Sequence, residues 1–209
     1  MKKFLLIVLT VTLINVHFAM AAQDSNEKNT GEKIDFSLKG NGYFINSSIV
    51  NREDGLSNHM SMIGKSKQLG KASINVLAEV AVTLNDGIPK SCVTPDGDQG
   101  ISAELVKAKG IIQLTKSGDQ LFTEATALSL CISLQCFDEE GKVKEGCTFQ
   151  PIATAKITGG TGKFSCASGQ INDIHTRTVL AINPKGEPFG SISGYSGKGK
   201  IYIPDSCSK

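Results

Sequence analysis

Residues 157–169, with the sequence ITGGTGKFSCASG, contain the residue types of a phosphate-binding loop. Such a loop needs a glycine, four further residues, and then Gly-Lys followed by Ser or Thr. Ile157 stands where the first glycine should be, and Phe164 stands where a hydroxyl would hold magnesium. The residues that follow are rich in Ser, Thr, Ile and Val, which favours extended chain over the helix that such a loop opens. The sequence therefore predicts a turn between two strands and no nucleotide site.

Gly159, Gly160 and Gly162 suit such a turn, because glycine adopts positive φ angles and lets neighbouring backbone approach closely. Glycines have no side chain to bury, so an adjacent residue must fix the turn. Phe164 is the only large apolar residue between the turn and Ile171. We therefore expect Phe164 to be an anchor in the core.

Residues that could act as acids or bases form no recognisable catalytic pattern. The weak candidates for binding residues are the glutamates of strand-like stretches, Glu79, Glu104 and Glu124. Strand glutamates mostly face solvent, so surface positions are expected for them. His175 is likewise expected at the surface. No Gly-x-Ser-x-Gly elbow or matched Ser/His/Asp spacing is present, so catalytic residues stay unassigned.

The N-terminus has the three-part pattern of a secretory signal peptide. Lys2 and Lys3 precede an apolar run, and small residues lead to an expected cleavage site at Ala21 or Ala22. The apolar run is about half the length of roughly 20 residues that a spanning helix needs. We expect a signal peptide at residues 1–22, a flexible segment at 23–32 and one domain at 33–209. The protein is expected to be exported, to the periplasm or the medium, without a membrane span.

The charge balance gives no support for nucleic-acid binding. Removing Lys2 and Lys3 from the 22 basic residues leaves 20, which equals the 20 acidic residues. A protein that binds nucleic acid or an anionic membrane should show a basic excess. We therefore expect neither partner.

The six cysteines indicate disulfide bonds, because their number is even and an exported chain meets an oxidising compartment. A zinc site would need close C-x₂-C pairs, whereas the nearest spacing here is Cys131 to Cys136, so no metal is expected. A two-residue turn at 141–142 would place Cys136 opposite Cys147 and Glu139 opposite Lys144. Cys136–Cys147 is thus the first-choice pair, and three pairings stay open for the rest: Cys92, Cys131, Cys166 and Cys207.

The dominant hydrophobic period along the chain is two, which is typical of strands. One face of residues 74–83 holds Ile74, Val76, Ala78, Val80 and Val82. One face of residues 127–137 holds Leu128, Leu130, Ile132 and Leu134. Further strand-like stretches lie at 101–114, 148–158, 170–182 and 197–203. Roughly eight strands without helices predict an all-β barrel or sandwich.

The segment 157–169 resembles bacterial secreted proteins that have the barrel of plant allene oxide cyclases and are distantly related to dirigent proteins. The matching positions are Gly159, Gly160, Thr161, Gly162, Phe164, Ala167 and Gly169. Weaker agreement extends over residues 36–44, 63–74 and 117–131. The resemblance implies a single antiparallel eight-stranded, calycin-like β-barrel, stabilised here by disulfides, whose mouth and interior can hold a small apolar ligand.

The matched motif is structural, so it carries none of the family's catalytic residues onto this chain. We expect a non-enzymatic barrel that binds a small apolar molecule or a partner surface, without a cofactor. The alternative is a cofactor-free isomerase or cyclase acting on an apolar substrate. A buried carboxylate facing a cavity would favour the second hypothesis. The oligomeric state stays open.

Overall fold

The structure is a computed structural model, which describes residues 31–47, 55–183 and 188–207. The expected signal peptide and residues 23–30 of the expected flexible segment lie outside the described residues. The remaining two residues of that segment already belong to the first strand. No helix in the described ranges is long and apolar enough to cross a membrane.

The described part of the chain is nearly all β-structure, with 74% of its residues in strands and 5% in helix. Within the described residues, eight strands have nine or more residues: β1 (Gly31–Ser47), β2 (Gly55–Ser66), β3 (Gly70–Val82), β7 (Gln99–Leu114), β8 (Gln120–Ser133), β10 (Ile152–Gly160), β11 (Ser168–Ile182) and β12 (Pro188–Pro204). The shorter elements are β4 (Leu84–Asn85), β5 (Ile88–Pro89), β6 (Ser91–Val93), β9 (Thr148–Phe149) and the 3₁₀ helices η1 (Leu134–Cys136), η2 (Gly162–Phe164) and η3 (Asp205–Cys207).

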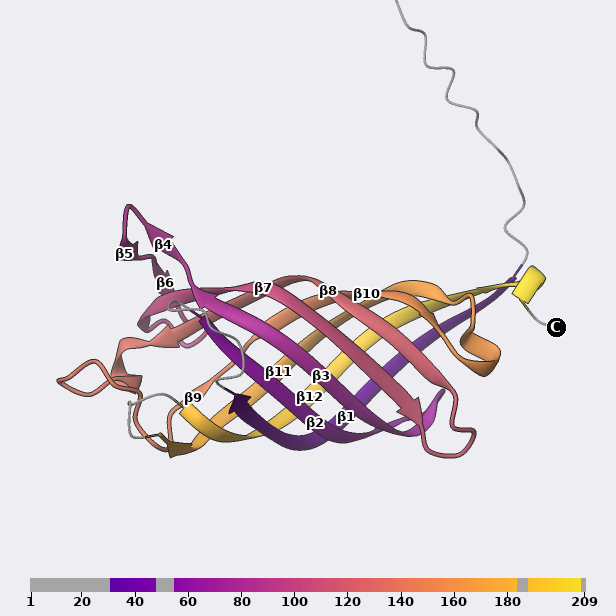
Figure 1. Ribbon diagram of the computed structural model, residues 1–209, viewed down its shortest axis with the longest axis horizontal. Coiled ribbons are helices and arrows are strands. Elements are labelled where there is room, and N and C mark those ends of the chain that lie inside the picture. Colours follow the sequence, from indigo (N-terminus) through magenta and orange to yellow (C-terminus); the bar gives the residue numbers. More distant parts are fainter. Residues whose placement is uncertain (1–30, 48–54, 184–187, 208–209) are drawn as a thin grey trace, which may run out of the picture.

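The long strands form a closed ring of antiparallel pairings. Their order is β10-β8-β7-β3-β2-β1-β12-β11, and β10 pairs again with β11. Figure 1 shows these strands running between two ends of the molecule. We call the end with β4, β5 and β6 the hairpin end, and the end with η2 and η3 the glycine-turn end. The expected all-β class with disulfides is confirmed.

The alternation expected along β3 places its apolar face inside the ring. Ile74 is buried, and Val76, Ala78 and Val80 follow it along the same inner wall. Val82, the last residue of β3, departs from the expectation and is exposed, although it still pairs with Ala103 of β7.

Leu134 also departs from the expected face. The expectation extended the alternation of β8 to this residue, but β8 ends at Ser133 and Leu134 begins η1. The Ser133 side chain accepts a hydrogen bond from the amide of Gln135 and so caps the helical turn. Leu134 is therefore exposed.

The glycine-rich segment connects two paired strands, β10 and β11. Gly160 lies so close to the carbonyl oxygen of Gln120 that a Cβ atom there would overlap it. Gly162 has a φ of 56°, a left-handed conformation that favours glycine. Phe164, in η2, is fully buried and packs in the apolar cluster of the glycine-turn end.

Two disulfides lie at the hairpin end. Cys136 is joined to Cys147 with a Cα–Cα distance of 5.2 Å, and Cys92 is joined to Cys131 at 5.9 Å. Cys166 is disulfide-bonded as well. The side chain of Cys207 lies outside the described part of the chain.

The turn between Cys136 and Cys147 differs from the expected one. Phe137 forms a bridge with Val143, so Glu139 does not face Lys144 and the predicted two-residue turn at 141–142 is wrong. The Asp138 carboxylate accepts hydrogen bonds from the amides of Glu140 and Lys142, which moves the turn toward the acidic residues. Cys136 and Cys147, the first-choice pair, nevertheless form their disulfide at the base of this turn.

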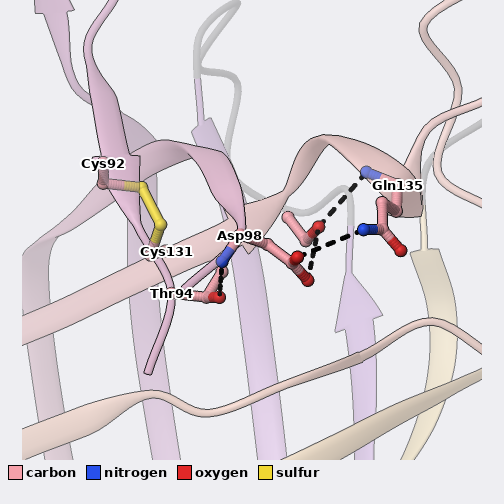
Figure 2. The surroundings of a disulfide bond; sticks show 6 residues. Cys92, Thr94, Asp98, Cys131 and Gln135 are labelled. Carbon is pink, nitrogen blue, oxygen red and sulfur yellow. Dashed lines mark hydrogen bonds between the residues drawn. A yellow bond between two sulfur atoms is a disulfide. The ribbon is translucent and has the colours of Figure 1, made fainter. Parts of the chain in front are cut away.

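The Cys92–Cys131 disulfide crosses β7, since β6 and β8 pair on opposite sides of that strand. Gly100 leaves room for it, because a Cβ atom there would lie 2.8 Å from the sulfur of Cys131. Figure 2 shows Asp98 beside this disulfide. Its backbone N–H donates to Thr94, and its carboxylate accepts from the Gln135 amide at 3.2 Å. These contacts fix the chain that leads from β6 into β7.

Replacing Phe164 by Ala should lower the free energy of unfolding by about 3–5 kcal/mol, since a fully buried ring is removed. Lys163→Ala is the neighbouring control. Its ammonium group lies 4.8 Å from the Phe164 ring centroid, a contact worth about 0.5–1 kcal/mol at an exposed site. Urea unfolding with intact disulfides measures both. A larger effect of Lys163→Ala would contradict the anchoring role of Phe164.

Removing each disulfide with a double serine variant should lower stability according to the loop that it closes. The separations of 11 and 39 residues correspond to about 3 kcal/mol for Cys136–Cys147 and about 4 kcal/mol for Cys92–Cys131 in the chain-entropy model. Urea unfolding provides the comparison. Thiol titration of the unmodified protein in denaturant, without reductant, should detect no reactive thiol among the four cysteines. Four reactive thiols would show that neither bond forms.

Candidate functional site

A cavity of about 100 Å³ lies inside the ring, between the apolar clusters of its two ends. Aliphatic side chains from β3, β7 and β8 form much of its wall. The space persists because many wall positions carry small residues: Ala78, Ala108, Gly110, Ala125, Ala153 and Ala155. An apolar interior of this kind is what a small-molecule site requires.

Three polar residues of β11 line this cavity. Asp173, His175 and Arg177 occupy alternate positions, so their side chains project from the same face of the strand. β-branched residues between them, including Thr176, favour the extended conformation. The antiparallel neighbour β12 adds Tyr195, which lies opposite His175 in the register. We call these four residues the polar cluster.

Asp173 and His175 form a buried contact within the polar cluster. Their residues are 9% and 7% exposed, and the Asp173 Oδ1 atom lies 2.8 Å from His175 Nε2. The distance is that of an ion pair, but Oδ1 has no partner in hydrogen-bond geometry, and neither has His175 Nδ1. Two polar atoms of cavity-lining residues are thus buried without a hydrogen-bond partner.

Aromatic rings hold the imidazole of His175 in place. Tyr195 meets it edge-on at a centroid distance of 5.0 Å, and Phe44 does so at 6.1 Å. The backbone N–H of His175 donates a hydrogen bond to the carbonyl of Pro151. Burial, and then the charge of Asp173, raise the pKa of the Tyr195 hydroxyl above its ordinary value. The hydroxyl therefore remains protonated and can donate a hydrogen bond.

Arg177 is the cation of the polar cluster. Its guanidinium carbon lies 3.2 Å from the ring centroid of Phe44 and 5.9 Å from that of Phe149. Burial lowers the pKa of Arg177 to about 9, so the side chain is still charged at neutral pH. Its Nε atom is buried without a hydrogen-bond partner, and no ion pair of Arg177 occurs within the described residues.

The structure places none of the three candidate glutamates against the cavity. Glu104 and Glu124 are exposed, and Glu79 is half-buried on the outer side of β3. Glu79 faces Lys107 across the strand pair, which suits an outer position. None of the three glutamates lines the cavity, whereas the four residues of the polar cluster do.

His175 corrects a second expectation, because it is buried rather than at the surface. Sequence reasoning also missed Asp173, Arg177 and Tyr195. The available signal was three charged or polar residues at alternate positions of one strand, which put all of them on one face. Nothing in β11 alone indicated that this face points inward.

The described residues contain no group of three or more His, Cys, Asp or Glu side chains able to hold a metal ion. No protein-family model, curated protein or solved structure matches this chain. The cavity and the residues that line it are therefore the basis for proposing a function.

Arg177→Met should raise the free energy of unfolding at neutral pH by about 1 kcal/mol or more, because a buried cation without a counter-ion is replaced by an apolar side chain of similar length. This net gain already allows for the lost stacking of Arg177 on Phe44, which is worth about 2 kcal/mol. Urea unfolding of both proteins measures the difference.

The pH dependence of that difference follows from the lowered pKa of Arg177. As the pH rises above about 9, the unfolded chain binds more protons at Arg177 than the folded protein does, so the contribution of Arg177 to stability rises with pH. Below about pH 9 Arg177 is charged in the folded protein, so the full free-energy cost of burying the charge applies. The advantage of Arg177→Met should therefore be largest at neutral pH and shrink as the pH rises through about 9. An advantage that grows with pH would contradict burial of the charged form.

Proposed function

We propose that this protein is an exported eight-stranded antiparallel β-barrel of the allene oxide cyclase type that binds a small apolar molecule in its interior. The closed order of strand pairings supports the barrel. The disulfides support export, because such bonds form and persist in oxidising compartments. The glycine-turn motif supports the family, although no match to a known protein accompanies it.

The observation that carries the binding function is the cavity itself. Well-packed interiors contain few voids larger than a water molecule. Here a space of about 100 Å³ is enclosed mainly by aliphatic side chains. An engineered apolar cavity of about 150 Å³ binds benzene, so a space of this order accepts a small ring or a short branched chain.

Small apolar molecules should bind the protein, and filling the cavity should prevent it. Toluene is a suitable probe, and the change in chemical shifts of backbone amides measures its binding. Ala125→Leu places a larger side chain in the wall and should abolish the shifts, whereas Ala127→Leu, on the exposed face of the same strand, should leave them unchanged. Equal toluene binding by both variants would contradict an interior site. Native mass spectrometry of protein from its own source would then identify a retained molecule.

The buried carboxylate of Asp173 favours a second candidate function, a cofactor-free isomerase or cyclase. Its contact with His175 places a potential proton acceptor beside a proton carrier at the cavity wall. Under this function, Asp173→Asn protein would retain a substrate isomer that the unmodified protein converts. Chromatography of the molecules released from the two proteins distinguishes the functions, since a binding protein would release the same compound from both.

A further inference from the structure

Arg177 combines three features that the fold itself does not require. It is charged at neutral pH, it borders an apolar cavity, and no carboxylate of the described residues lies within ion-pair distance of it. The nearest candidate on its own strand, Asp173, is four residues away and contacts His175 instead. Arg177 is half-buried as a residue, and within the described residues the rings of Phe44 and Phe149 lie against its guanidinium.

We infer that Arg177 binds the anionic head group of the cavity's ligand, and that this ligand is a compact aromatic or alicyclic carboxylate. The inference rests on the proposed binding function and names the class of molecule bound. Its apolar ring would occupy the cavity, and its carboxylate would lie against the guanidinium.

The stacking of Arg177 selects a planar anion. Phe44 covers one face of the guanidinium, so the N–H groups remain at its edge, and the Nε–H group has no partner. A carboxylate is planar and accepts hydrogen bonds from that edge in the plane of the guanidinium. An ionised acceptor would satisfy both the hydrogen-bond capacity and the charge, whereas water would satisfy only the first.

The remaining groups of the polar cluster fit the same ligand. Tyr195 stays protonated, and its hydroxyl lies against Gly197, the residue paired with Asp173, so it adds no charge to the cavity. Asp173 already has the His175 imidazole at 2.8 Å and would repel a second anion only at its own end of the cavity. The cavity of about 100 Å³ sets the size, since it suits a single ring and not a long alkyl chain.

The test compares four probes of similar size: benzoate, benzamide, benzylamine and toluene. Isothermal titration calorimetry at neutral pH and low salt gives the affinities, and amide chemical shifts locate the site. Benzoate should bind at least about tenfold more tightly than benzamide, because only benzoate supplies the counter-charge. Benzylamine should bind most weakly, since the guanidinium repels it.

Variants at Arg177 separate charge from shape. Arg177→Met should reduce benzoate affinity by at least about tenfold and leave toluene binding unchanged. Arg177→Lys keeps the charge but loses the planar fork, so benzoate affinity should be intermediate. Lys39→Met removes an exposed cation from the outer face of β1 and should leave benzoate binding unchanged. Urea unfolding shows that each variant is folded before its affinities are compared.

The outcomes distinguish this inference from the proposed function. Toluene binding without a preference for benzoate, or equal benzoate affinity in Arg177→Met, overturns the anion site and leaves the binding function standing. Preferential binding of benzylamine also overturns it, because Asp173 would then select the ligand. Failure of all four probes to bind the folded protein overturns both.

Discussion

The hydrogen-bonded pairing of β10 with β11 is the constraint on which the rest of the structure depends. It joins the first and last members of the strand order, so the long strands form a ring. A ring leaves no long strand with an unpaired edge, which removes the usual site of edge-to-edge association. It also gives every strand an inner and an outer face. The glycine-rich connection matters for this reason, because it brings β10 back alongside β11.

Closure makes an interior that the side chains fill unevenly. At the glycine-turn end, Phe164 and its neighbours form a dense apolar cluster. At the hairpin end, Phe149 and Val179 pack with the Cys136–Cys147 disulfide. Between the two clusters, alanine and glycine occupy several positions of the wall. The cavity is thus a consequence of residue size at specific inward positions and not of a gap between strands.

The strands of this fold could be predicted from the sequence where their inward faces are apolar, as in β3. The same rule fails at β11, where Ile174 and Leu180 point outward and Asp173, His175 and Arg177 point inward. A shift of one residue exchanges the two faces of a strand, so the period identifies β11 without fixing its orientation. Its partners fix it, since pairing with β12 places His175 opposite the buried Tyr195. The polar cluster depends on that pairing between distant residues.

This reversal of faces in β11 lowers the stability of the fold. Outward Ile174 and Leu180 lose burial, and inward Asp173 and Arg177 lose hydration. A strand with the opposite orientation would avoid both losses but would expose Ile171 and Val179, and β10 and β12 hold β11 in the observed register along most of its length. A fold that keeps charged groups inside at such an energetic disadvantage is expected where those groups meet a ligand. Under the proposed binding function, the unpartnered Nε of Arg177 and Nδ1 of His175 are the atoms whose hydrogen bonds a bound molecule would complete.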